Sequence, residues 1–174
     1  MKMYLCDRTL KLSATIDKLI PHDMSNVVFI CIGTDRSTGD SFGPIVGSLL
    51  KEYGLTNIEG TLHQPVHAMN LKETVERHKD KFIFAIDACL GRSDSVGKIS
   101  ATNKPIRPGA GVNKDLGEVG DASLTAVVNV GGFMEYFVLQ NTRLSTVMDL
   151  AQTASNAIIH VMENRLPVCE VAAL

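Results

Sequence analysis

The sequence predicts a three-layer α/β fold, with a mostly parallel, twisted sheet that carries helices on both faces. Two apolar runs, Val27–Ile32 and Lys81–Asp87, are nearly continuous, as is typical of strands buried on both faces of a parallel sheet. Segments with helical spacing alternate with these runs. The 174 residues are 45% hydrophobic, which is enough for one well-packed core, so we expect a single domain over residues 1–174.

The predicted elements follow one another in a β-α-β-α-β order. An N-terminal helix over Leu10–Ile20 ends before Pro21, and Pro44 fits only the first turn of the next helix, with Asp40 or Ser41 as its cap. The other predicted strands are Ile58–His63, Val96–Thr102 and Ala126–Val130, and the other helices are Leu71–His78 and Leu144–Met162. Ligands of such sheets bind beyond the carboxyl ends of the strands.

Composition excludes several classes of function. Lys and Arg number 17 against 19 Asp and Glu, so we expect no affinity for nucleic acid. No apolar stretch approaches the ~20 residues that span a bilayer, and residues 1–12 lack the core of a signal peptide, so we expect no membrane association. The four cysteines are widely scattered, which is typical of a reducing compartment. We therefore expect a cytoplasmic protein.

Two acidic residues are the candidate catalytic groups. Asp40 follows the loop that leaves the first strand, and Asp87 ends the run Lys81–Asp87. Both should lie at one edge of the sheet, where two carboxyl groups can act as general acid and base on one water. In the alternative interpretation, Asp40 only caps a helix and Asp87 only accepts hydrogen bonds from loop amides.

Three segments resemble the spore germination protease family. They are GTDRSTGDSFGP at residues 33–44, Ile86-Asp87-Ala88, and PGAGVNK at residues 108–114. The resemblance implies a phosphorylase/hydrolase-like fold and an acid endopeptidase that uses Asp40 and Asp87 without a cofactor. It also implies peptide or protein substrates, such as small acid-soluble spore proteins, and extends the expected location to the spore interior.

The positions of the two aspartates are also similar to those of the hydrogenase maturation endopeptidases, which recognise nickel in their substrate protein. That family's metal-binding histidine would lie further along the chain, yet no histidine occurs between His78 and His160. We therefore expect no bound metal.

Six further residues are candidates for substrate binding. Asp35 and Arg36 belong to the first loop of the active edge, where exposed charges either orient a peptide or are only solvated. His63 and His67 flank Pro65 and would serve as hydrogen-bonding, structural or metal-binding groups. Gly109 and Gly111 belong to the Gly-rich segment Pro108–Gly120, which is either a flap over the site or a plain exposed loop.

The sequence also predicts how the two aspartates divide their roles. Asp40, near a helix N-terminus, should favour its ionised form and act as the base, whereas Asp87, after an apolar run, should act as the protonated acid. Cys89 offers a thiol nucleophile as an alternative, although free cysteines are mostly small buried hydrophobes. A module that binds a peptide without cleaving it is the alternative on this fold, and the pair of aspartates favours the enzyme.

Overall fold

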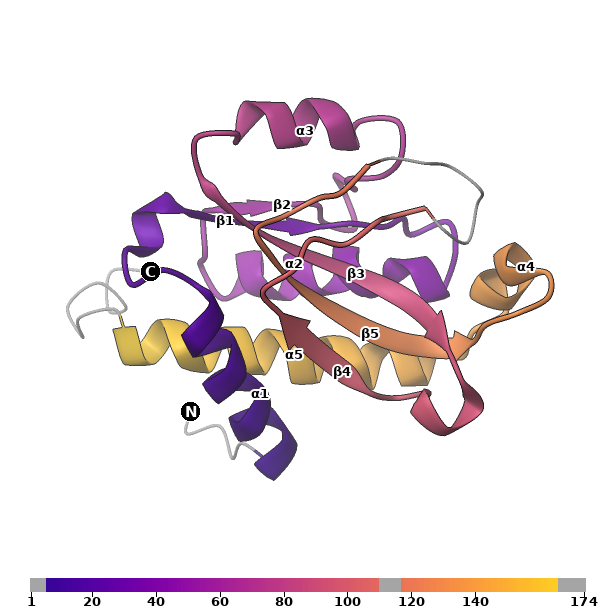
Figure 1. Ribbon diagram of the computed structural model, residues 1–174. Helices are drawn as coiled ribbons and strands as arrows, with labels where there is room; N and C mark the ends of the chain where they lie inside the picture. The colour runs from indigo at the N-terminus through magenta and orange to yellow at the C-terminus, as the bar shows by residue number, and fades with distance from the viewer. Residues whose placement is uncertain (1–5, 110–116, 166–174) are drawn as a thin grey trace.

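The computed structural model describes residues 6–109 and 117–165 and contains a five-stranded sheet in the order β2-β1-β3-β5-β4 (Figure 1). The strands are β1 (Val27–Cys31), β2 (Ile58–Glu59), β3 (Phe82–Gly91), β4 (Ile99–Thr102) and β5 (Ala122–Val130). β1 pairs in parallel with β2 and β3, and β3 pairs in parallel with β5. Only the edge strand β4 is antiparallel among these pairs. The predicted mostly parallel sheet is thus confirmed.

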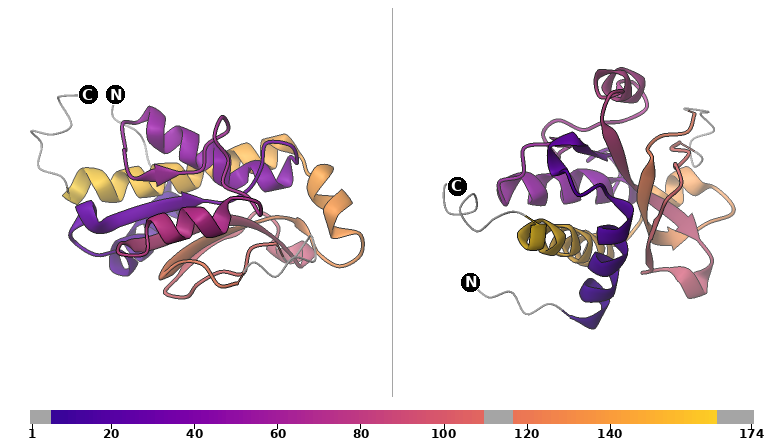
Figure 2. Two further views of the ribbon diagram at one scale, coloured as in Figure 1. Left: turned by 90° about the horizontal axis from the view of Figure 1, so that it is seen from above. Right: turned by 60° about the vertical axis from the view of Figure 1, so that its left-hand side comes forward.

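Helices cover both faces of the sheet, as Figure 2 shows from above. One face carries α1 (Asp7–Leu19), α2 (Phe42–Glu52) and α5 (Leu144–Arg165), and the other carries α3 (Leu71–Arg77). A short helix, α4 (Glu135–Gln140), follows β5. The predicted three-layer arrangement is therefore confirmed.

The strand β1 is apolar throughout because both of its faces are covered. All five of its residues are buried. Phe29 packs edge-on against Phe84 of β3, with ring centroids 5.6 Å apart, under the helices α1, α2 and α5. Val28 and Ile30 face the opposite cluster with Leu71 of α3. Full burial of such a side chain stabilises the fold by roughly 1.5–3 kcal/mol.

Several predicted strand boundaries were wrong, and β4 begins at Ile99 rather than at Val96. β3 does not end at Asp87 but continues to Gly91, because β5 runs beside it from the Phe84–Ala122 pair to the Gly91–Val130 pair. For the same reason β5 begins at Ala122 rather than Ala126. β2 stops at Glu59, because Gly60 adopts a left-handed conformation with φ 90°.

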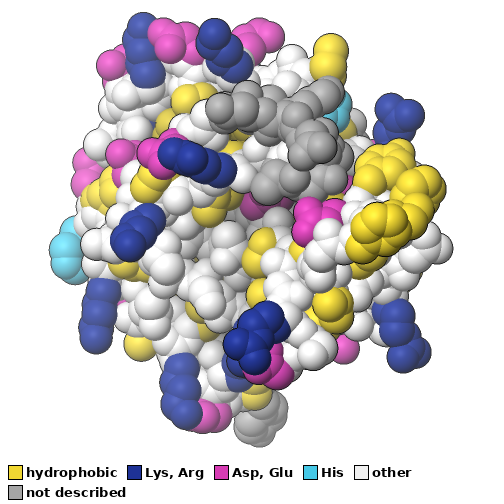
Figure 3. All heavy atoms as spheres, turned by 45° about the vertical axis from the view of Figure 1, so that its right-hand side comes forward, with side chains coloured by type: hydrophobic (Ala, Val, Ile, Leu, Met, Phe, Trp, Pro, Cys, Tyr) yellow, Lys and Arg dark blue, Asp and Glu magenta, His cyan; other side chains and the backbone are white. Residues whose placement is uncertain are grey.

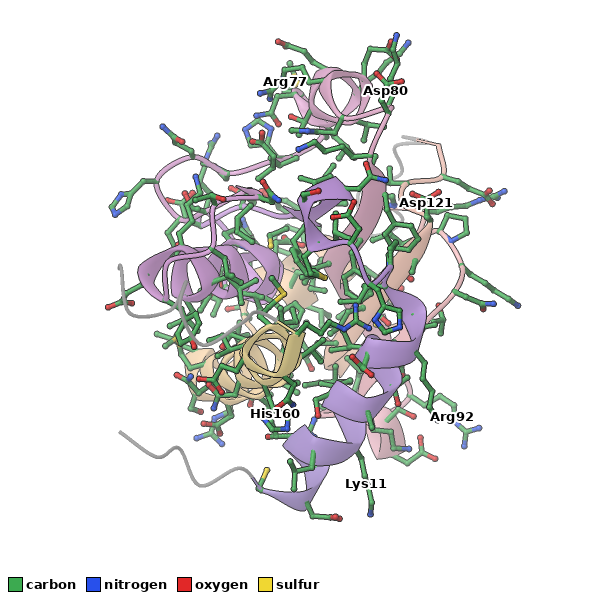
Figure 4. The ribbon with its side chains drawn as sticks, turned by 90° about the vertical axis from the view of Figure 1, so that its left-hand side faces the viewer. Lys11, Arg77, Asp80, Arg92, Asp121 and His160 are labelled. Atoms are coloured by element: carbon green, nitrogen blue, oxygen red, sulfur yellow. The ribbon has the colours of Figure 1, made fainter. Side chains whose placement is uncertain are left out.

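Polar contacts tie the ends of the elements together without belonging to the candidate site. Asp121, labelled in Figure 4, accepts a hydrogen bond of 2.8 Å from Ile83 N and so fixes the start of β5 against the start of β3. Arg165 at the end of α5 donates to Asp17 Oδ1 at 2.7 Å and to Pro21 O at 2.6 Å. In the part of the chain that the structure describes, no helix is long and apolar enough to cross a membrane.

Candidate active site

The order of the strands places a crevice at the carboxyl ends of β1 and β3. From β1 the chain passes through α2 to β2 on one side, and then through α3 to β3 on the other side. Loops that leave neighbouring strands in opposite directions separate at such a switch point, where α/β proteins bind ligands. Asp40 follows β1 and Asp87 lies in β3, so both aspartates belong to this edge.

The loop after β1 folds back tightly and brings Asp40 to the end of the strand. Gly33 N donates to Val66 O at 2.8 Å, and Thr34 N donates to Asp40 O at 3.1 Å. Gly33 has φ 143°, and a Cβ atom there would lie 1.9 Å from Asp40 O. Only glycine fits this approach, so Gly33 lets the backbone of Asp40, seven residues further along the chain, lie against the end of β1.

Asp40 does not cap a helix. It lies in the short 3₁₀ helix η2 (Gly39–Ser41), directly before α2. Neither η2 nor α2 has a side-chain hydrogen bond at its N-cap, and the hydroxyl of Ser41 instead donates to Thr38 O at 2.6 Å. Ser41 occupies the N-cap position of α2, as predicted, but the predicted role of Asp40 as the cap was wrong, and neither side chain makes a capping hydrogen bond.

Burial shifts the pKa of Asp40 in the direction opposite to our expectation. The Asp40 carboxyl is half-buried, and burial raises its pKa, although the hydroxyl of Ser37 lowers that pKa in part. Ser37 Oγ is buried and lies close to this carboxyl group, and it makes no hydrogen bond of normal geometry to the residues that the structure describes. Loss of hydration thus outweighs any helix-end effect on Asp40.

Asp87 holds its proton more firmly than Asp40. Burial raises the pKa of Asp87 well above its ordinary value, the N–H of Ala88 opposes this by donating to Asp87 Oδ1 at 2.8 Å, and the charge of Asp40 raises the pKa further. The two carboxyl groups therefore interact electrostatically. When one proton remains on the pair, Asp87 is its favoured site and Asp40 is the ionised partner.

The other polar candidates lie around this edge in different surroundings. Asp35 and Arg36 are exposed in the loop after β1. His67 follows Val66, whose carbonyl binds the same loop, and His67 Nδ1 accepts a hydrogen bond of 3.3 Å from Met69 N. His63 is exposed in the loop that ends β2. Within the described ranges, no group of three or more His, Cys, Asp or Glu residues could hold a metal ion.

The Gly-rich segment is described only in part. Its two arms are joined by an antiparallel bridge between Ile106 and Val119, which pack in the same cluster as Ile32 and Val66 at the end of β1. Gly109 occupies a turn with φ 87°. Gly111 and most of the proposed flap, residues 110–116, lie outside the described residues.

Cys89 is a poor candidate for a nucleophile. The thiol lies two residues beyond Asp87, and burial raises its pKa, as does the negative charge of Asp87. A thiol must lose its proton to attack a carbonyl carbon, so both effects oppose that role.

Sequence reasoning missed two features of this edge. One is the buried hydroxyl of Ser37, which no motif distinguishes from any other loop serine. The other is α4, which packs against η2: a Cβ atom on Gly39 would lie 2.8 Å from Leu139 Cδ2 and 3.0 Å from Thr142 Oγ1. A six-residue helix is too short to give a periodic signal.

Comparisons with known proteins agree with this architecture. Residues 3–157 match a family described as "Protein of unknown function (DUF1256)". The chain is 54% identical over 138 residues to the uncharacterized protein YyaC of Bacillus subtilis (strain 168), a match that covers 76% of this chain and 67% of YyaC. The structure is similar to that of a [NiFe] hydrogenase maturation protease, HycI from Thermococcus kodakarensis KOD1, with a TM-score of 0.59 and 14% identity. That similarity covers 86% of this chain and 99% of HycI, and at such low identity it shows a shared fold alone.

Proposed function

This chain belongs to the family of proteins of unknown function DUF1256, and we propose that it is an acid endopeptidase in which Asp40 and Asp87 activate water for peptide-bond hydrolysis. One observation carries this proposal: two half-buried carboxyl groups at the switch point both have raised pKa values, and the charge of one acts on the other. Pairs of carboxyl groups with separated proton affinities are suited to general acid and base work.

Each aspartate has a distinct role in the proposed reaction. The ionised Asp40 accepts a proton from water as the water oxygen attacks the peptide carbonyl carbon. Asp87 gives its proton to the leaving nitrogen, which departs as an amine when the C–N bond breaks. The products are a carboxylic acid and an amine, and no cofactor is consumed.

The fold supports the peptidase class, and the three motifs support a narrower class of substrate proteins. HycI is a maturation protease on a similar fold, which favours peptide hydrolysis over unrelated chemistry but assigns no residue of this chain. The three motifs that resemble germination proteases favour a role in sporulation or germination. We therefore propose small acid-soluble spore proteins as the first substrates to test.

A metal-recognising endopeptidase is the less favoured alternative. The name of HycI refers to a nickel-containing hydrogenase. In the described parts of this chain, however, the donor set does not fit a metal centre, and His67 Nδ1 already accepts a hydrogen bond from Met69 N. We therefore derive no step that involves a metal.

The proposal is tested by cleavage assays on paired variants. Wild type, Asp40→Asn, Asp87→Asn and the double variant are incubated with small acid-soluble spore proteins between about pH 4 and pH 8, and intact masses are followed. Each single variant should lose about 100- to 10,000-fold in rate, and the double variant should be scarcely worse, because the two groups act together. Asp149→Asn, an exposed carboxyl on α5, is the matched control.

Two results would contradict the proposal. Wild-type activity in a folded Asp40→Asn or Asp87→Asn protein would remove that residue from the mechanism. Binding of peptides by wild type without cleavage of any of them would favour the non-catalytic binding module instead.

A further inference from the structure

We propose that an exposed apolar surface around α4 binds an apolar side chain of an extended polypeptide whose backbone lies beside Asp40 and Asp87. The α4 surface consists of Val130, Phe133, Met134, Tyr136 and Phe137. This inference rests on the proposed peptidase function, for which it names the substrate preference.

The α4 surface exposes several large apolar side chains to solvent. Phe133 is 87% exposed and Phe137 is 53% exposed, and their neighbours are also partly open to solvent. Figure 3 shows hydrophobic side chains gathered on this side of the molecule, next to acidic ones. An open hollow of about 590 Å³ is lined by Val130, Phe133, Met134 and Phe137, together with Asn129 and Asn141. Contiguous apolar surfaces of this kind mark binding sites more often than isolated exposed residues do.

The backbone before α4 holds these side chains in place. Met134 has φ 55°, a left-handed conformation that a residue with a long side chain rarely adopts. Gly132 N donates to Glu135 Oε1 at 3.1 Å, and the rings of Tyr136 and Phe137 meet edge-on at 5.6 Å. Strained turns of this type concentrate at functional sites, because folding alone does not favour them.

The α4 surface belongs to a segment that packs against the candidate active site. The helix α4 packs on η2, which carries Asp40, through the contact between Gly39 and Leu139. On the other side, Asn129 of β5 lines the hollow, and its Nδ2 donates to Val138 O at 3.3 Å and to Thr142 Oγ1 at 3.1 Å. A ligand held at Asp40 and Asp87 therefore has the α4 surface as its neighbour.

Beyond Ile86, one edge of β3 has no partner strand in the described part of the chain, and this edge indicates the kind of ligand. The ladder between β1 and β3 ends with the Cys31–Ile86 pair, whereas β3 continues to Gly91. Among the described residues, Asp87–Gly91 pair with β5 alone. An unpaired strand edge accepts an extended peptide as an added strand.

The register links this edge to the hollow. On the other edge of β3, Leu90 and Gly91 pair with Asn129 and Val130 of β5, which line the hollow, so the hollow lies across β3 from the free edge, at the same end of the strand. A peptide that follows β3 beyond Asp87 is thus led from the two carboxyl groups towards the α4 surface. This continuity favours an extended substrate over a second copy of the chain.

The inference is tested by peptide binding in the absence of cleavage. The probes are two fluorescein-labelled peptides of about ten residues, one with leucine at alternate positions and one with serine at those positions, measured by fluorescence anisotropy. They are titrated with Asp87→Asn protein, alone and combined with Phe133→Ser, with Phe133→Ser and Phe137→Ser, or with Leu10→Ser. Leu10 is a matched control, because it is 44% exposed on α1, which packs on the α5 face of the sheet.

We expect the leucine peptide to bind at least ~10-fold more tightly than the serine peptide, and the double serine variant to lose ~10-fold or more in affinity for it. The single variant Phe133→Ser should lose part of this affinity, and Leu10→Ser should lose none. Thermal melting verifies that each variant is folded. If the double variant does not fold, the single change at the highly exposed Phe133 still provides the test.

Several outcomes overturn the inference. These are equal affinity for the two peptides, unchanged affinity after the α4 substitutions, or a wild-type dimer in sedimentation that Phe133→Ser dissociates. If proteins are cleaved at rates independent of the α4 substitutions, the inference fails while the proposed function stands. If the leucine peptide binds through α4 but wild type cleaves nothing, the peptidase proposal fails while peptide docking stands.

Discussion

Replacing Asp87 by asparagine should stabilise the folded protein at neutral pH. The pKa of Asp87 is raised well above its ordinary value of 3.8, first by burial and then by the charge of Asp40. As the pH rises above about 3.8, the unfolded chain releases this proton while the folded chain keeps it, so stability falls with rising pH. The loss is complete once the pH exceeds the folded-state pKa. Below the ordinary value both states are protonated, and Asp87 has no effect of this kind.

The size of the effect follows from the difference in proton affinity. Asparagine has nearly the same shape and can still accept the hydrogen bond from Ala88 N, which is 2.8 Å long in the wild type, but it carries no charge. Each tenfold difference in proton affinity between the folded and unfolded chain is worth about 1.4 kcal/mol. For a chain of this length, each 1 kcal/mol corresponds to roughly 2–4 °C in Tm. Asp87 is only half-buried, so water screens part of the penalty.

The assay is thermal unfolding of wild type, Asp87→Asn and the exposed control Asp149→Asn at several values between about pH 3 and pH 8. The difference in Tm between Asp87→Asn and wild type should be near zero at the lowest pH and should grow as the pH rises. A difference that is the same at every pH, or a less stable Asp87→Asn protein at neutral pH, would refute the argument that Asp87 is held protonated by burial.

Two other substitutions test the packing that supports the site. Gly60→Ala should lower the free energy of unfolding by about 3–5 kcal/mol, because the residue has φ 90° and a Cβ atom would lie 1.9 Å from Cys31 O. Its control Gly97→Ala should lower it by only about 1–2 kcal/mol, because Gly97 has φ 88° but no atom lies within 4 Å of the added Cβ atom. Equal losses of unfolding free energy in urea would show that the contact with β1 is unimportant. Arg165→Met should lower the free energy of unfolding by about 1.5–3 kcal/mol, because the Arg165 side chain is 8% exposed and donates hydrogen bonds to Asp17 and Pro21. Its control Arg92→Met should lower it by less than about 0.5 kcal/mol, because the Arg92 side chain is 86% exposed. Similar melting temperatures for these two variants would contradict the argument that Arg165 holds the end of α5 to the end of α1.

Elements with a strong local pattern could be predicted from the sequence. The continuous apolar run at Val27–Ile32 and the run before Asp87 gave β1 and the first part of β3, because strands buried on both faces have no polar side. The amphipathic spacing of the first and last helices likewise located α1 and α5. The common edge of Asp40 and Asp87 followed from the alternation of strands and helices alone.

Features that depend on distant partners could not be predicted in this way. The continuation of β3 past Asp87 depends on β5, which lies beside it in space but follows it by more than thirty residues in the chain, as the pair Asp87 and Thr125 shows. The raised pKa of Asp40 depends on what covers the carboxyl group, and the local sequence indicated the opposite direction.

Periodicity and the direction of parallel strands are local properties, so the layers of this protein and the sheet edge to which Asp40 and Asp87 belong could be inferred from the amino-acid pattern. Three features came from the folded arrangement: Asp40 raises the pKa of Asp87, Ser37 Oγ is buried beside Asp40, and α4 packs on the segment that carries Asp40. The physical reason is that loss of hydration, Coulombic interaction and close packing depend on separation in space, which strand order sets and which distance along the chain does not reveal.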